Sequence, residues 1–123
     1  MASVRYIVRS VDQAVAFYRD RLGFTFEQQF GPAMAIVSRD DLTLWLAGPG
    51  ASASRPMPDG RQPEPGGWNR FVLRVDDLAA LVTDLRRQGV TFRNEVVKGP
   101  GGQQILCEDP SGNVVELFQP GAR

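Results

Sequence analysis

The stretch VDDLAALV at residues 75–82 repeats, at about half the chain length, the stretch VRSVDQAV at residues 8–15. A second pair of segments keeps nearly the same offset, because LTLWLAGP at residues 42–49 returns as NVVELFQP at residues 113–120. An internal repeat of this kind indicates two copies of one supersecondary unit. Neither copy has enough sheet and helix to bury its own apolar faces, so the two are expected to pair.

Each half shows the same order of apolar periodicities: one strand, one helix and three further strands. In the first half, Ser10 and Gln13 form a capping box that begins the helix, and Gly23 ends it. In the second half the helix begins at Asp77 or Leu78 and stops at Gly89. The strands are expected at residues 4–8, 24–30, 34–38, 42–47, 68–75, 91–97, 103–107 and 114–118.

This order predicts an α+β fold in which two βαβββ repeats form a cupped, eight-stranded mixed sheet with the helices on its outer face. At 123 residues with 42% hydrophobic side chains, the chain suits one domain, residues 1–123. The first unit spans residues 1–48 and the second spans residues 68–120. Between them, residues 49–67 are rich in proline and glycine and are expected to be a linker or flap.

The composition excludes some partners. Lysine plus arginine and aspartate plus glutamate both number 14, so the zero net charge favours neither nucleic acid nor a membrane surface. A small-molecule ligand or a second copy of the chain is the expected partner. The single cysteine, Cys107, has no partner for a disulfide within the chain, which is typical of a cytoplasmic protein. We expect Cys107 to be a small buried strand residue, because there is no histidine to activate it.

Three motifs of the chain are similar to motifs of one known superfamily. They are VD…AFYRD…LGF at residues 11–24, VDDL at residues 75–78 and EDPSGNVVEL at residues 108–117. They are similar to the vicinal oxygen chelate superfamily, which contains glyoxalase I, extradiol dioxygenases and metal-free proteins that bind bleomycin or mitomycin. The resemblance covers nearly the whole chain except the linker. It implies the fold named above, but that fold supports several chemistries and some pure binding functions.

The resemblance also implies where a metal would be held. Metal-using members carry ligands at four equivalent points, which fall here at Ser3, Trp45, Arg70 and Glu116. Only Glu116 is a suitable ligand, and the chain contains no histidine. The resemblance is therefore to the metal-free members, and we expect no metal and no cofactor.

Strand alternation predicts which side chains line the concave side of the sheet. Trp68, at the end of the flap, is expected either to close over that side or to pack against a second copy. The candidate ligand-binding residues are Arg5, Ile7, Trp45, Trp68, Arg70, Val72, Gln104, Glu116 and Phe118. Their mixture of aromatic, aliphatic and hydrogen-bonding groups is typical of a small-molecule site.

Two of these positions allow another interpretation. Trp45 can be a core residue, because a tryptophan on a sheet buries a large apolar area. Arg70 and Glu116 can form a structural ion pair between strands rather than hold a ligand. The sequence leaves both interpretations open.

The expected function is that of a glyoxalase/bleomycin-resistance-like protein that binds or sequesters a small, partly aromatic molecule. Trp45 and Phe118 would hold its rings, and Arg70 and Glu116 its polar edge. The alternative is a lyase, isomerase or dioxygenase-type enzyme without a histidine-ligated metal, with Glu116 as the catalytic base. A third possibility is an interaction domain without a ligand. Proteins that resemble this chain usually form homodimers, and a homodimer is expected here.

Overall fold

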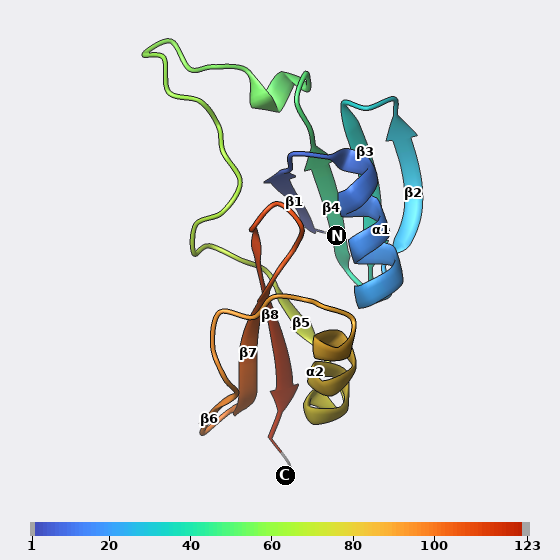
Figure 1. Ribbon diagram of the computed structural model, residues 1–123, viewed down its shortest axis with the longest axis vertical. Coiled ribbons are helices and arrows are strands. Elements are labelled where there is room, and N and C mark those ends of the chain that lie inside the picture. The colour runs from blue at the N-terminus through green and yellow to red at the C-terminus, as the bar shows by residue number, and fades with distance from the viewer. Residues whose placement is uncertain (1, 122–123) are drawn as a thin grey trace. The chain divides into compact units, whose positions relative to one another are not determined.

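The computed structural model describes residues 2–121 of the chain (Figure 1). They form two compact units: unit 1 extends to Gly66 and includes Pro110–Asn113, whereas unit 2 contains Gly67–Asp109 and the chain from Val114 onward. Each unit has the order strand, helix and three strands. The predicted α+β class and the two βαβββ repeats are confirmed, with the eight strands divided between two four-stranded mixed sheets.

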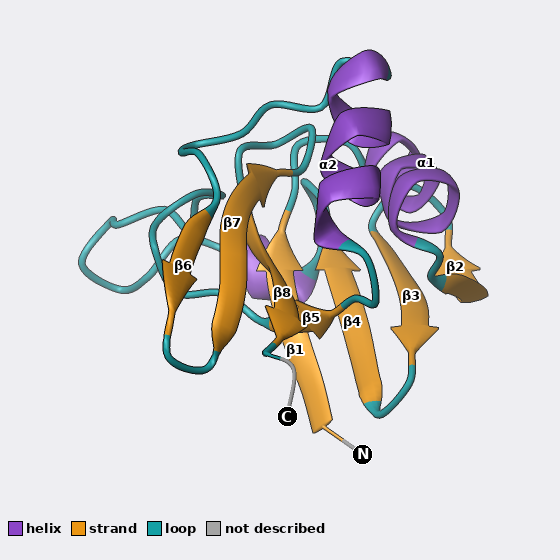
Figure 2. Ribbon diagram, turned by 90° about the horizontal axis from the view of Figure 1, so that it is seen from below, coloured by secondary structure: helices purple, strands orange, loops and turns teal. Residues whose placement is uncertain are grey.

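Unit 1 is a four-stranded sheet with one helix on one face (Figure 2). The strand order is β1-β4-β3-β2, with β1 parallel to β4 and the other neighbours antiparallel. Its elements are β1 (Ala2–Ile7), α1 (Val11–Leu22), β2 (Thr25–Phe30), β3 (Met34–Arg39) and β4 (Leu42–Ala47), and a short 3-10 turn, η1 (Ser52–Ser54), follows in the linker.

Unit 2 repeats this topology with the order β5-β8-β7-β6, in which β5 and β8 are the parallel pair. The other neighbours are antiparallel. Its elements are β5 (Val72–Arg74), α2 (Leu78–Arg87), β6 (Val97–Gly99), β7 (Gly102–Glu108) and β8 (Val114–Pro120).

The helix boundaries follow the signals in the sequence. The Ser10 side chain accepts a hydrogen bond from the Gln13 backbone N–H, and Asp77 accepts one from that of Ala80. Gly23 ends α1 in the left-handed conformation, with a φ of 72°, which a residue with a side chain adopts at a cost. Both predicted helix starts are therefore confirmed.

Each sheet buries one face under its helix. In unit 1 the buried face includes Tyr6, Val37, Leu44 and Leu46, and Tyr18 of α1 is fully buried. In unit 2, Leu73, Ile105, Val115 and Leu117 are at most 5% exposed, as are Leu78 and Leu85 of α2. Burying each such side chain contributes about 1.5–3 kcal/mol, so these apolar faces hold each unit together.

Two strands of unit 2 are shorter than the sequence predicts. The sequence predicts a strand at residues 68–75, but only Val72–Arg74 form β5, and the carbonyl of Trp68 accepts a hydrogen bond from the Arg70 side chain rather than from a neighbouring strand. The strand predicted at residues 91–97 is replaced mostly by irregular chain. There the Asn94 side chain accepts the hydrogen bond of the Leu106 backbone N–H, which a strand carbonyl would otherwise take.

The turn at 110–113 belongs to unit 1 and fixes the end of the linker there. Asn113 is 4% exposed; its Nδ2 donates to the carbonyl of Ile7 (2.7 Å) and its Oδ1 accepts from the N–H of Gly66 (2.8 Å). Ser111 accepts a hydrogen bond from the Arg9 backbone N–H. Neither helix of residues 2–121 has the length and hydrophobicity to cross a membrane.

Candidate small-molecule site

The face of the unit 1 sheet opposite α1 carries an aromatic ring with a cation over it. Arg5 and Trp45 are register partners on the parallel strands β1 and β4, and Ile36 is the partner of Trp45 on β3. The Arg5 guanidinium carbon lies 4.9 Å from the centre of the Trp45 ring. Trp45 alternates with the fully buried Leu44 and Leu46, so it points away from the helix-covered face and is half-buried. It is therefore not a residue of the core under α1.

Ile7, at the end of β1, borders a small pocket under the linker. The pocket has a volume of about 280 Å³ and lies within unit 1. Its walls come from the chain after β1 and from the proline-rich linker: Ile7, Val8, Arg9, Pro49, Gly50, Ser54, Gln62, Pro63 and Pro65.

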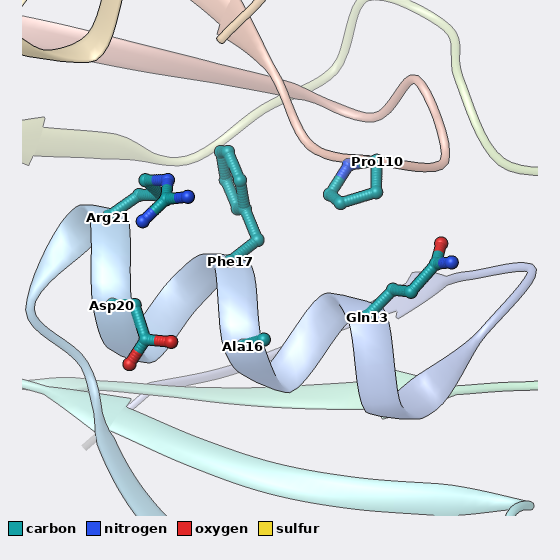
Figure 3. A pocket seen from close by; sticks show the side chains of 6 residues that line it. All are labelled: Gln13, Ala16, Phe17, Asp20, Arg21 and Pro110. Atoms are coloured by element: carbon teal, nitrogen blue, oxygen red, sulfur yellow. The ribbon is translucent and has the colours of Figure 1, made fainter. Parts of the chain in front are cut away.

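Figure 3 shows a second pocket of unit 1, on the outer side of α1, with a volume of about 250 Å³. The side chains of Gln13 and Phe17 project from the helix toward the turn that carries Pro110. None of the residues predicted for the ligand site lines this pocket.

In unit 2 the structure brings Arg70 and Glu116 together. Arg70 donates from Nε (3.0 Å) and from Nη2 (2.9 Å) to the same carboxylate oxygen, Glu116 Oε1. The Arg70 side chain is 28% exposed and that of Glu116 is 10% exposed. The predicted ion pair exists, and it lies largely away from water.

The other predicted residues of unit 2 surround this pair. Val72 is the register partner of Glu116, and Phe118 is the partner of both Arg74 and Gln104. Val72 is half exposed, whereas Gln104 and Phe118 are partly buried. These side chains share the sheet face opposite α2, so the alternation inferred from the sequence places them together.

Trp68 lies between two arginines of the same unit. Its ring lies over Arg93, whose guanidinium carbon is 4.6 Å from the ring centre, and its carbonyl accepts a hydrogen bond from Arg70 Nη1 (3.3 Å). Arg93 in turn donates to Glu108 (2.8 Å) and to the carbonyl of Gly67 (2.6 Å). Trp68 remains 67% exposed. The exposed indole thus contacts Arg93 of the Arg93–Glu108 pair, and the backbone of Trp68 is bonded to Arg70 of the Arg70–Glu116 pair.

Sequence reasoning missed Arg93 and Glu108 as neighbours of the site. Both lie outside the repeat positions used to select candidates. Their pairing across the irregular 91–96 segment and β7 becomes visible only in the structure.

Cys107 is fully buried on the α2-covered side of the unit 2 sheet. Burial, followed by the nearby carboxylate of Asp109, raises the pKa of the Cys107 thiol to about 12. A thiol of this kind is neutral near pH 7 and is a poor nucleophile, so it adds no chemistry to the site.

The residues at the four ligand-equivalent positions do not fit a divalent transition metal. Arg70 has no lone pair to donate, Trp45 offers none from its ring, and the Glu116 carboxylate is already paired with Arg70. The Ser3 hydroxyl alone cannot supply the three or four donors that such an ion needs. Within residues 2–121, no group of three or more His, Cys, Asp or Glu side chains is placed to hold a metal ion.

The tandem βαβββ units and the polar–aromatic sheet faces define a protein class known for metal enzymes and for ligand-binding proteins. Residues 1–117 match the model of the Glyoxalase/Bleomycin resistance protein/Dioxygenase superfamily, and the chain belongs to that superfamily. No curated protein sequence gives a significant match.

Several solved structures share the fold. TnmS3, an antibiotic binding protein from Streptomyces sp. CB03234, is 28% identical with a TM-score of 0.74, covering 97% of this chain and 93% of its own. A superfamily member from Sphaerobacter thermophilus is also 28% identical, with a TM-score of 0.75 and coverage of 97% and 95%. The lactoylglutathione lyase of Agrobacterium tumefaciens is 23% identical (TM-score 0.74, coverage 97% and 92%), which shows a common fold alone.

Proposed function

We propose that this protein binds and sequesters a small, partly aromatic molecule without a metal ion. The proposal is carried by three of the ligand-equivalent residues, Trp45, Arg70 and Glu116, and by the side chains that contact them. Arg70 neutralises Glu116 in unit 2, and Trp45 lies under Arg5 in unit 1. An aromatic ring that stacks on such a platform gains about 0.5–1.5 kcal/mol beyond the burial of its area.

Similarity to an antibiotic-binding protein at 28% identity supports this class of ligand. The Trp68 ring, exposed and supported by Arg93, is a further aromatic surface that a planar molecule can cover. Homodimer assembly and a cytoplasmic location, expected from the sequence, stay predictions.

Tryptophan fluorescence tests the proposal, because the chain has two tryptophans. A Trp68→Phe variant reports on Trp45 and a Trp45→Phe variant reports on Trp68. Titration with mitomycin, planar quinones and 2-naphthamide is expected to change the emission of at least one variant saturably. Calorimetry would supply the dissociation constant.

A matched pair of variants separates specific from adventitious binding. Trp45→Ala is expected to weaken binding about tenfold or more, which corresponds to about 1.4 kcal/mol. Phe26→Ala removes an aromatic ring that is 43% exposed on the edge strand β2, where Phe26 is the register partner of the buried Val37 on the sheet face away from Trp45, and is expected to leave binding unchanged. Equal losses in both variants, or no saturable binding to any compound, would exclude the proposed function.

The rival function is a metal-independent lyase or isomerase with Glu116 as the base. In the structure the Glu116 carboxylate is the ion-pair partner of Arg70 rather than a base placed beside a reacting group. We therefore expect the bound compounds to be recovered unchanged after prolonged incubation, which mass spectrometry of the mixture would check.

A further inference from the structure

The carboxylate of Glu116 uses only one of its two oxygens. Both hydrogen bonds from Arg70 end on Oε1, and no group of residues 2–121 donates to Oε2. The Glu116 side chain is only 10% exposed. A carboxylate oxygen of such a side chain has little room for water, so a hydrogen-bond donor on a ligand would be a favourable partner for it.

Oε2 is also reachable from outside the protein. Within the described chain, no side-chain nitrogen or oxygen is both fully buried and without a partner. An unpartnered Oε2 must therefore keep some contact with the surroundings. It is an open acceptor at the surface of an otherwise buried side chain.

Arg70 also has N–H groups that make no hydrogen bond within the described chain. A guanidinium has five N–H groups. Three of them are used, by Nε and Nη2 to Glu116 and by Nη1 to the carbonyl of Trp68. Two N–H groups of Arg70 thus remain for a ligand, on the side chain that is ion-paired with Glu116.

The surroundings of the pair select against a charged ligand group. Arg70 and Glu116 neutralise each other, and the register partners of Glu116 on the two neighbouring strands are the aliphatic Val72 and Leu106. An anionic group would be repelled by the carboxylate and a cationic group by the guanidinium. A neutral group with a donor next to an acceptor satisfies both partners, and neither charge loses its counter-charge.

We propose that Arg70 and Glu116 form a recognition pair for a neutral donor–acceptor edge on an aromatic ligand, such as a carboxamide, a lactam or a hydroxyl group beside a carbonyl. The ligand N–H or O–H donates to Glu116 Oε2, and its carbonyl accepts from Arg70. This inference rests on the proposed function and names the chemical group that Arg70 and Glu116 recognise.

Two matched probes test the pair: 2-naphthamide, which has amide N–H groups, and N,N-dimethyl-2-naphthamide, which has none. Calorimetric titration of the protein is expected to show about tenfold tighter binding of the primary amide, because a hydrogen bond to a charged acceptor is lost in the dimethyl compound. In the double variant Arg70→Met/Glu116→Leu, both probes are expected to bind with similar affinity. This variant replaces both charges together, so it leaves no lone charge buried.

The control is the double variant Arg86→Met/Glu95→Leu, which makes the same replacements at an exposed ion pair of unit 2. It is expected to keep the preference for the primary amide. Thermal unfolding of both variants would confirm that they fold.

The possible outcomes separate a failure of the recognition pair from a failure of the proposed function. Equal binding of the two probes by the unmodified protein would overturn the recognition pair and leave aromatic binding in place. A preference that survives in Arg70→Met/Glu116→Leu would also overturn it. Absence of binding by either probe would overturn the proposed function, and the recognition pair with it.

Discussion

Arg5 and Trp45 are paired both by the backbone and by their side chains. They are register partners on the parallel strands β1 and β4, and the guanidinium carbon lies 4.9 Å from the centre of the indole ring. The pair is on the sheet face that α1 leaves uncovered, so its ring and its charge are available to a ligand rather than committed to the core.

Replacing Arg5 tests the strength of this contact. Arg5→Met is expected to lower the free energy of unfolding by about 0.5–1 kcal/mol, because a cation–π contact at an exposed site contributes about that amount. Arg5→Lys keeps the charge and is expected to lose less. Urea unfolding followed by the fluorescence of Trp45, in a Trp68→Phe background, measures both. Equal stabilities of the Met and Lys variants would show that the charge over the ring contributes nothing.

Removing one partner of the Arg70–Glu116 ion pair is expected to cost more stability than removing both partners. Arg70→Met leaves the Glu116 carboxylate, which is 10% exposed, without its counter-charge and is expected to cost about 2 kcal/mol or more. Arg70→Met/Glu116→Leu is expected to be close to the unmodified protein in stability. Chemical unfolding of the two variants tests this, and a double variant that is as unstable as the single one would contradict it.

Asn113 is expected to protect the linker from cleavage by a protease. Asn113→Ala removes the hydrogen bonds to Ile7 and Gly66 and leaves both backbone groups without that partner, at a cost of about 2 kcal/mol. Trypsin should then cleave faster after Arg61, an exposed residue of the linker. The control is Gln88→Ala, which removes an exposed hydrogen bond to Asp84 away from the linker and is expected to leave stability and cleavage unchanged. Cleavage that is equally fast in the two variants would refute this role of Asn113.

Cys107 makes stability depend on pH in the alkaline range. The pKa of its thiol is raised from 9.0 to about 12 in the folded protein, so between these values the unfolded chain loses a proton that the folded chain keeps. The contribution of the neutral thiol to stability is fully present below pH 9 and is lost as pH rises toward 12. Urea unfolding at pH 8 and pH 10 is expected to show a smaller decrease in stability for Cys107→Val than for the unmodified protein.

A reagent that reacts with thiolates gives a second measurement. At pH 8 the folded protein is expected to react very slowly with a disulfide reagent, and the protein in urea is expected to react at once. Rapid reaction of the folded protein would contradict the burial of Cys107.

The sequence predicted the fold well because its signals are local and occur twice. The positions where the helices begin could be predicted from the caps at Ser10 and Asp77, and the end of α1 from Gly23. Period-two alternation identified the helix-covered faces of the sheets. The prediction was wrong about the length of β5 and β6. There the backbone is directed by side chains such as Asn94, whose hydrogen bond to Leu106 depends on tertiary structure.

The candidate site could be predicted only in part. The repeat selected Trp45, Arg70 and Glu116, and the structure places Arg70 against Glu116. The support of Trp68 by Arg93 could not be foreseen, because it depends on an irregular segment that sequence periodicity describes as a strand.

The most direct test of metal-independent binding is a calorimetric titration of the untagged protein with 2-naphthamide. One sample is prepared with a chelator, and others are prepared with Mn²⁺, Ni²⁺ or Zn²⁺. The untagged protein is needed because the chain itself contains no histidine. We expect saturable binding with the same dissociation constant in every sample. Binding or turnover that appears only when one of the ions is present would contradict the account.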